Sequence, residues 1–172
     1  PCGVVRSQCY LGRSPWSEDA YLAATIDELR IWNGARTATE IRQNMLKTVP
    51  GNVTGLVAHY SFNENSGTML TNAATNGGAG SAYLEYEENV RISSPIQETA
   101  NALGLDGNND FVSIGSPLVP NSSYTKEAWV YLTKDPQLPQ NIISSNASPF
   151  WIAGNFLSAS NYGAANPITD PN

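Results

Sequence analysis

Residues 25–41 read TIDELRIWNGARTATEI, a strand followed by the beginning of a helix. We predict that the strand covers residues 25–33. Thr37 and Glu40 have the spacing of a capping box, in which each side chain accepts a hydrogen bond from the other residue's backbone N–H. A short helix is therefore expected from Thr37 toward Leu46. A strand and helix of this kind are typical of the end of a β-sandwich domain, although they stand near the start of this chain.

The chain after this helix contains a series of short strands. Residues 47–54 include Pro50 and Gly51 and have no periodic apolar face, which predicts a linker. In residues 56–62, LVAHYSF, apolar side chains alternate with polar ones, as in a half-buried strand. Residues 157–172 have little that could pack and are expected to form a loop. Further strands, each bounded by turn residues, are expected at 81–87, 101–105, 111–114, 124–132, 141–145 and 150–156.

The pattern of these strands indicates the fold class. No amphipathic helix of crossover length separates them, so a parallel α/β sheet is disfavoured. Short strands joined by turns instead predict an all-β protein, an antiparallel β-sandwich. With 172 residues and 41% hydrophobic content, the chain can bury one sizeable core but hardly two.

The charge balance excludes some partners. The net charge is −6, and the nine basic residues are scattered along the chain. An acidic protein without a basic stripe repels phosphate backbones, so we expect no nucleic-acid partner. No apolar run approaches the roughly 20 residues needed to span a bilayer, so no membrane insertion is expected.

Two cysteines and three sequons bear on the cell compartment. Cys2 and Cys9 would be about 23 Å apart in one straight strand, whereas a disulfide needs less than about 7 Å between Cα atoms. A disulfide therefore requires a turn between them, and two free thiols are the alternative. The glycosylation sequons at Asn52, Asn121 and Asn146 are compatible with export, so we expect a secreted or cell-surface protein.

Several motifs occur in a recognisable order. They are GLVAHYSFNENSG (55–67), TNAATNGGAG (71–80), NALGLDGNNDFVSI (101–114), YTKEAWVYL (124–132) and YLGRSPWSEDAYLAATIDELRIWNGARTATEI (10–41). This set resembles laminin G-like jelly rolls of the concanavalin A-like lectin and glucanase superfamily, which also contains the pentraxins. The resemblance covers most of the chain and implies a jelly-roll β-sandwich.

The order of the matching motifs implies an unusual domain organisation. Residues 1–46 resemble the C-terminal strands and helix of such a domain, residues 47–54 the linker, and residues 55–172 the N-terminal part of the next domain. The middle strands of the family pattern are missing between the two parts. Three arrangements remain open: a window from a tandem array, a permuted domain, or a subunit completed by a neighbouring copy. We favour completion by other copies of the chain or by adjacent repeats, because incomplete sheets leave unpaired edges.

The sequence contains no catalytic constellation. His59 is the only histidine and has no nucleophile placed beside it by a recognisable motif, so we expect a plain surface histidine. Glu85 and Glu87 share one face of a predicted strand, as paired acids do in glycoside hydrolases. The acid pattern of the glucanase branch is nevertheless absent. We therefore expect a protein that is not an enzyme.

Calcium is the candidate cofactor. Asp106, Asn108 and Asp110 stand two residues apart in DGNND, so their oxygens could converge on a hard cation if the chain curls. The alternative is an Asn-rich hairpin turn between two strands. At residues 12–16, GRSPW stands where pentraxins have an acidic calcium-binding run. Ligand recognition through calcium as in pentraxins is therefore not expected.

Loop aromatics are the candidate ligand-binding residues. Pyranose faces stack on aromatic rings, while amide and carboxylate groups orient the hydroxyls. Trp16, Tyr21, Asn146 and Trp151 fall in or beside predicted loops, whereas Trp32 and Trp129 are expected in the core. We predict a non-enzymatic adhesion or structural module that repeats or forms filaments by strand complementation, with glycans or cell-surface proteins as further partners. The alternative is a carbohydrate-binding module appended to a secreted enzyme.

Overall fold

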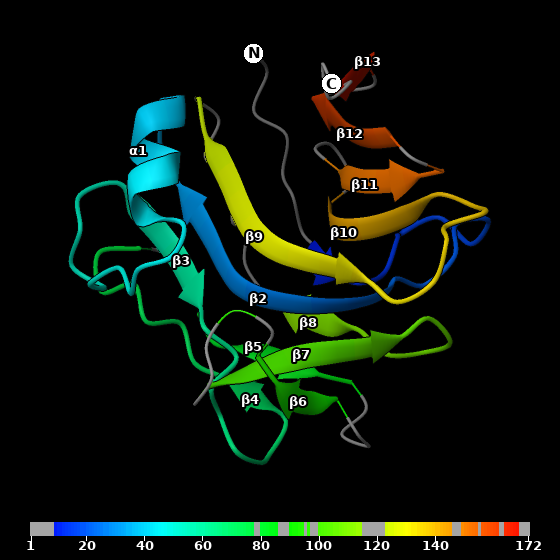
Figure 1. Ribbon diagram of the computed structural model, residues 1–172, viewed down its shortest axis with the longest axis horizontal. Helices are drawn as coiled ribbons and strands as arrows, with labels where there is room; N and C mark the ends of the chain where they lie inside the picture. The colour runs from blue at the N-terminus through cyan, green and yellow to red at the C-terminus, as the bar shows by residue number, and fades with distance from the viewer. Residues whose placement is uncertain are drawn as a thin grey trace.

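A computed structural model of the chain describes residues 9–77, 80–85, 90–94, 96, 100–114, 123–145, 149–154, 156–161 and 164–168. These residues form two antiparallel sheets that pack as a β-sandwich, together with one short helix (Figure 1). The predicted fold class is therefore confirmed.

The larger sheet has eight strands in the order β13-β12-β11-β10-β1-β8-β5-β4. The short strand β1 pairs with β10 on one side and with β8 on the other. Its alternation places Cys9 and Leu11 in the core and Tyr10 on the outer face. The strands are β1 (Cys9–Leu11), β4 (Met69–Leu70), β5 (Ala82–Leu84), β8 (Val112–Ile114), β10 (Gln140–Ser145), β11 (Phe150–Ala153), β12 (Phe156–Asn161) and β13 (Ala164–Ile168).

The smaller sheet has five strands and is organised around β2, whose ten residues are all buried. Strand β9 pairs along one edge of β2, and β7 and β3 share the opposite edge. Figure 1 shows β2 and β9 running side by side. The strands are β2 (Ala23–Trp32), β3 (Leu56–Tyr60), β6 (Arg91–Ser93), β7 (Asn101–Asp106) and β9 (Thr125–Leu132).

Both sheets combine strands from the two predicted parts of the chain. β1 and β2 come from residues 1–46, and their pairing partners come from the chain after residue 55. The two parts therefore pack on each other within one chain. The segment 47–54 also contributes to packing, because Val49 is buried beside Trp32 and Leu56. The domain boundaries themselves remain a prediction.

The helix α1 (Ala38–Asn44) has the capping box that the sequence indicates. The Glu40 backbone N–H donates to Thr37 Oγ1 over 3.2 Å, and the Thr37 N–H donates to Glu40 Oε2 over 2.8 Å. The helix ends at Asn44, with Met45 as its C-terminal cap. The residues that follow it turn back over the five-stranded sheet.

The end of the chain differs from the prediction. Residues 150–156 were expected to form one strand, but β11 and β12 are separate strands that pair as a hairpin. Gly154 in the turn has φ = +56°, a conformation that glycine adopts without strain. The loop predicted for residues 157–172 is wrong for the residues described there, since residues 157–161 of β12 pair with residues 164–168 of β13. Pairing with a neighbouring strand stabilises a segment whose side chains alone give a weak signal.

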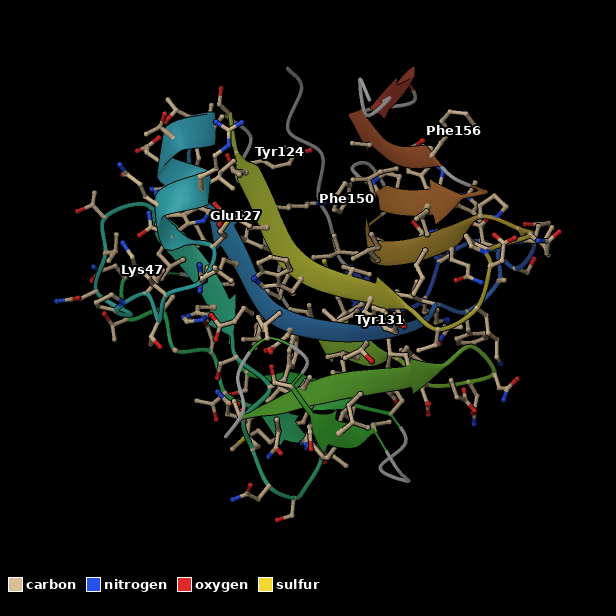
Figure 2. All side chains as sticks on the ribbon, in the orientation of Figure 1. Lys47, Tyr124, Glu127, Tyr131, Phe150 and Phe156 are labelled. Carbon is tan, nitrogen blue, oxygen red and sulfur yellow. The ribbon has the colours of Figure 1, made fainter. Side chains whose placement is uncertain are left out.

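Burial of the core is uneven across the sandwich. The side chains of β1, β2, β3, β5, β7 and β8 that face the core are buried, whereas the core-facing residues of one flank are only partly buried. Tyr124 and Phe150 both lie on this flank (Figure 2). The partly buried members are Tyr124, Ala128, Val130, Leu132, Phe150, Ile152 and Leu157, all on or next to β9, β11 and β12.

Candidate ligand-binding site

A pocket lies beside the loop that joins β1 to β2. It has a volume of about 270 Å³ and is lined by Arg13, Ser14, Pro15, Trp16, Ser17, Asp19 and Tyr21. We call it the loop pocket. Its loop covers the outer face of the eight-stranded sheet, since Ser144 Oγ on β10 donates to the Arg13 carbonyl over 2.5 Å.

The base of this loop is fixed by the backbone. The Leu22 N–H donates to the Gly12 carbonyl over 2.9 Å, and the Gly12 N–H donates to the Ile142 carbonyl over 3.1 Å. Gly12 has φ = +83°, and a Cβ atom there would lie 2.5 Å from Leu105 Cδ1. Glycine is therefore required for the chain to leave β1 at this angle.

Asp19 is held in a defined orientation within the loop pocket. Its Oδ2 accepts hydrogen bonds from Ser14 Oγ over 2.6 Å and from Asn141 Nδ2 over 3.0 Å. Ser14 Oγ also accepts from the Trp16 N–H over 3.1 Å, which fixes the turn that carries the indole. The other carboxylate oxygen of Asp19, Oδ1, accepts no hydrogen bond from the described residues. It can accept hydrogen bonds from hydroxyl groups of a ligand.

Aromatic rings form the support of the pocket. The Arg13 guanidinium makes cation–π contacts with the rings of Phe111 and Tyr10, with its Cζ 4.7 and 5.2 Å from their centroids. The rings of Tyr10 and Phe111 meet edge to face at 5.6 Å, and Tyr21 packs against Phe111 at 6.2 Å. Trp16 is 47% exposed at the rim. The pocket thus combines an open aromatic face, a guanidinium and an oriented carboxylate.

The structure brings together two of the four predicted ligand-binding residues. Trp16 and Tyr21 both line the loop pocket. Trp151 is half-buried on β11, directly opposite Asn141 on β10, so it adjoins the residue that holds Asp19. Asn146 lies outside the described residues. The ligand-binding role of all four remains a prediction.

Sequence reasoning missed Arg13, Asp19 and Asn141. Arg13 and Asp19 stand in a loop that begins at Gly12 and contains Pro15, and Ser14 precedes Asp19 by five residues. That spacing could have suggested a closed polar loop. The contact of Asn141 with Asp19 joins residues 122 positions apart, and it follows only from the pairing of β1 with β10. No local pattern carries this information.

The DGNND loop uses its oxygens within the turn. Asp106 accepts from the Asn108 N–H over 2.8 Å and from Asn108 Nδ2 over 2.7 Å, while Asp110 Oδ2 accepts from the Asp106 N–H over 3.2 Å. Lys134 Nζ donates to the Asp106 carbonyl over 2.9 Å. In the described ranges, no three or more His, Cys, Asp or Glu side chains are grouped to hold a metal ion. Calcium binding by Asp106, Asn108 and Asp110 stays a prediction.

Only one member of the predicted disulfide can be placed. Cys9 is buried on β1 within the core. Cys2 lies outside the described residues, so the Cys2–Cys9 disulfide stays a prediction.

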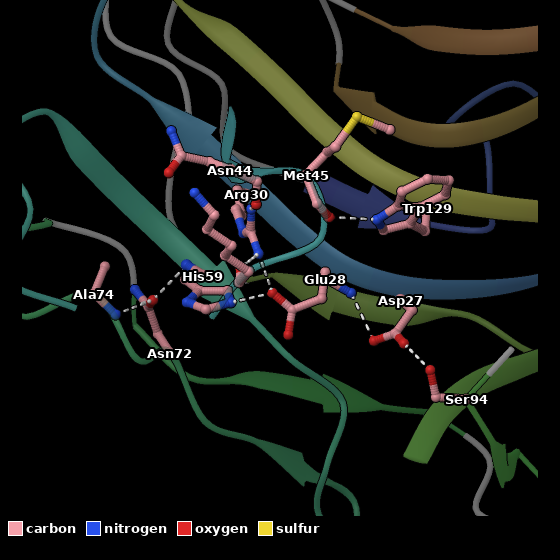
Figure 3. A network of polar contacts seen from close by, with 11 residues as sticks. Asp27, Glu28, Arg30, Asn44, Met45, His59, Asn72, Ala74, Ser94 and Trp129 are labelled. Carbon is pink, nitrogen blue, oxygen red and sulfur yellow. Dashed lines mark hydrogen bonds and ion pairs between the residues drawn. The ribbon is translucent and has the colours of Figure 1, made fainter. Parts of the chain in front are cut away.

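His59 is part of a buried polar cluster on the outer face of the five-stranded sheet (Figure 3). His59 Nε2 donates to Glu28 Oε2 over 2.9 Å, and Arg30 Nη2 donates to the same oxygen over 2.5 Å. Arg30 also donates to the carbonyls of Asn44 and Lys47, over 2.8 and 2.6 Å. The cluster therefore ties the segment after α1 to the sheet. The expected surface position of His59 is wrong, because its side chain pairs with buried Glu28 and the residue is 2% exposed.

Two acidic residues of this cluster have shifted pKa values in opposite directions. Burial by itself would raise the pKa of Glu28, but the hydrogen bonds from His59 and Arg30 outweigh it and lower the pKa below its usual value. Burial raises the pKa of Asp27, although Ser94 Oγ donates to its carboxylate over 2.5 Å. Glu28 also has φ = +51° at a bulge in the pairing of β2 with β9. These groups serve the packing of the sheet.

The fold places the protein among antiparallel β-sandwiches. Comparison with protein-family models, with curated proteins and with solved structures finds no match. The similarity to laminin G-like domains therefore stays a resemblance of motifs. No helix in the part of the chain that the structure describes is long and apolar enough to cross a membrane.

Proposed function

We propose that this chain is a non-enzymatic adhesion module of a secreted or cell-surface protein, which binds a saccharide in the loop pocket. One observation carries the proposal: exposed Trp16 and oriented Asp19 lie in the same pocket, which is supported by the eight-stranded sheet. An aromatic face for the sugar ring and fixed polar groups for its hydroxyls are the two elements of saccharide recognition. A loop held to a sheet also keeps them in position without a ligand.

The environment of His59 supports a function other than catalysis. Its Nε2 is hydrogen-bonded to Glu28, and the ring is 2% exposed. A general base must reach a proton on a bound substrate, so a covered imidazole paired with a carboxylate suits a structural role better.

The proposal predicts that Trp16→Ala lowers saccharide affinity at least tenfold, because stacking on the indole is lost. Binding would be screened on a glycan array and measured by calorimetry with the best hit. Tyr83→Ala is the matched control, since Tyr83 is 51% exposed on β5, three strands away from β10 in the sheet order. Trp151→Ala should lower the saccharide affinity less than Trp16→Ala does, because Trp151 lies opposite Asn141 and would affect Asp19 only through that residue. Unchanged binding by the Trp16 variant would exclude the loop pocket.

A second candidate function is strand complementation between copies or adjacent repeats. The observation that favours it is the flank formed by β9, β11 and β12, where core-facing apolar residues are only partly buried. Within the described residues, β9 pairs with β2 on one edge only. A long edge strand beside uncovered apolar side chains is a template for an added strand.

A further inference from the structure

We propose that the loop pocket selects acidic sugars, with the Arg13 guanidinium as the group that binds the sugar carboxylate. This inference rests on the proposed saccharide function and names the ligand class of the same pocket. It follows from three properties of Arg13: its contacts with two aromatic rings, its N–H donors, which no described residue uses, and its placement beside Trp16 and Asp19.

Two aromatic rings hold the guanidinium of Arg13 by cation–π contacts. Its Cζ lies 4.7 Å from the ring centroid of Phe111 and 5.2 Å from that of Tyr10, and the two rings meet edge to face. A cation–π contact uses the charge of the guanidinium and none of its hydrogen-bond donors. In the part of the chain that the structure describes, the N–H groups of Arg13 therefore stay available to a ligand.

The charge of Arg13 is not neutralised within the described residues. The ion pairs formed there involve Arg30, Arg36 and His59, and none includes Arg13. Asp19 lines the same pocket, but its Oδ2 accepts from Ser14 and Asn141 and forms no ion pair with Arg13. An arginine whose N–H donors are not used by the described residues can bind a carboxylate in the pocket through two parallel hydrogen bonds.

The other residues that line the pocket indicate which kind of ligand bears the carboxylate. Trp16 offers a face for a pyranose ring, and the free oxygen of Asp19 can accept from a ring hydroxyl. A volume of about 270 Å³ suits a single sugar at the end of a chain. The net charge of −6 disfavours long polyanions such as sulfated glycosaminoglycans. The fitting ligand is thus one uronic or sialic acid residue.

Matched sugar pairs test this selectivity. Calorimetry would compare methyl β-glucuronide with methyl β-glucoside, and methyl β-galacturonide with methyl β-galactoside, and would add the methyl glycoside of N-acetylneuraminic acid. Each pair differs only in the C6 carboxylate. In at least one pair, we expect the acidic sugar to bind about tenfold tighter than its neutral partner. Added salt should reduce this difference in affinity.

Variants assign the preference to Arg13. Arg13→Gln should remove the tenfold preference while keeping the affinity for the neutral sugar, and Arg13→Lys should keep only part of it, because a lysine lacks the planar fork. Arg42→Gln, an exposed charge on α1, is the control for net charge. Circular dichroism melts would establish that each variant is folded.

The outcomes separate this inference from the proposed function. Equal binding of acidic and neutral sugars, lost in Trp16→Ala, would overturn the role of Arg13 and leave the saccharide pocket standing. A preference for acidic sugars that persists in Arg13→Gln would also overturn the role of Arg13 and leave the saccharide pocket standing. No binding of any of these sugars by the folded wild type would contradict both proposals.

Discussion

Individual residues show how burial changes the role of a charged group in this protein. Glu28 and Arg30 are 4% and 2% exposed, and His59 completes the cluster from β3. A buried carboxylate of this kind is stable only when its donors are present, because an unpaired charge in the interior costs several kcal/mol. The cluster links β2, β3 and the segment after α1.

At the residue scale we predict that Glu28→Gln lowers the free energy of unfolding by roughly 3 kcal/mol at neutral pH, since Arg30 loses its buried partner. The folded-state pKa of Glu28 lies below its usual value. Its contribution is therefore present above the unfolded pKa of about 4.3 and is lost as the pH falls through the folded pKa.

Urea unfolding of wild type and the Glu28 variant at pH values from 3 to 7 would check this. The difference between them should shrink toward acid pH. Glu85→Gln, which changes an exposed carboxyl group, is the control and should stay within about 0.5 kcal/mol of wild type at neutral pH. A difference in the free energy of unfolding that does not change with pH would contradict the argument that the ionised carboxylate of Glu28 stabilises the fold.

Among the elements, the loop between β1 and β2 is the one whose conformation decides the candidate site. Its start depends on Gly12, whose φ of +83° is unfavourable for residues with a side chain. Its middle depends on Asp19, whose carboxylate accepts hydrogen bonds from Ser14 in the loop and from Asn141 on β10. The geometry of the pocket therefore depends on the backbone as much as on the aromatic side chains.

At this scale Gly12→Ala is expected to destabilise the protein by about 1–2 kcal/mol through backbone strain. It should also weaken any saccharide bound in the loop pocket, because the loop must leave β1 at another angle. Thermal unfolding and calorimetry would measure the two effects. Gly80→Ala is the control, since a Cβ atom there meets nothing within 4 Å; equal effects of the two substitutions would contradict the argument.

The whole molecule is a sandwich whose flank at β9, β11 and β12 is less well covered than the rest. Tyr124, Val130 and Phe150 pack against the core yet stay partly buried, and Figure 2 shows Tyr124 and Phe150 on the two layers. Lys126 lies next to Tyr124, with its ammonium group 5.5 Å from the ring centroid. A lysine on an edge strand limits the addition of another strand, so a strand that pairs with β9 must accommodate Lys126.

At the scale of the molecule, strand complementation predicts self-association that increases with protein concentration. Sedimentation velocity would measure it. Val130→Asp, on the core-facing side of β9, should weaken the association at least tenfold, whereas Tyr131→Asp on the outer side of the same strand should change it less. Amide exchange in β9 should slow with concentration as the edge becomes paired. A monomer at every concentration, with β9 amides unchanged, would contradict this function.

The sequence by itself determined the elements whose signals are local. Alternation predicted a strand at 56–62, of which residues 56–60 form β3. The Thr37 and Glu40 spacing predicted the start of α1, and the short strands predicted the antiparallel sandwich. It also drew attention to Trp16 and Tyr21, because exposed loop aromatics are visible as residue types. These features depend on side-chain periodicity and on short-range hydrogen bonds.

Only the tertiary structure decided which distant segments meet. Pairing of β1 with β10 brought Asn141 to Asp19, and pairing of β2 with β3 brought His59 to Glu28. The pairing of β12 with β13 likewise gave strands where the side chains alone suggested a loop. Sheet pairing between remote segments depends on backbone hydrogen bonds and on shared burial, and neither is encoded in the residue types of a single segment.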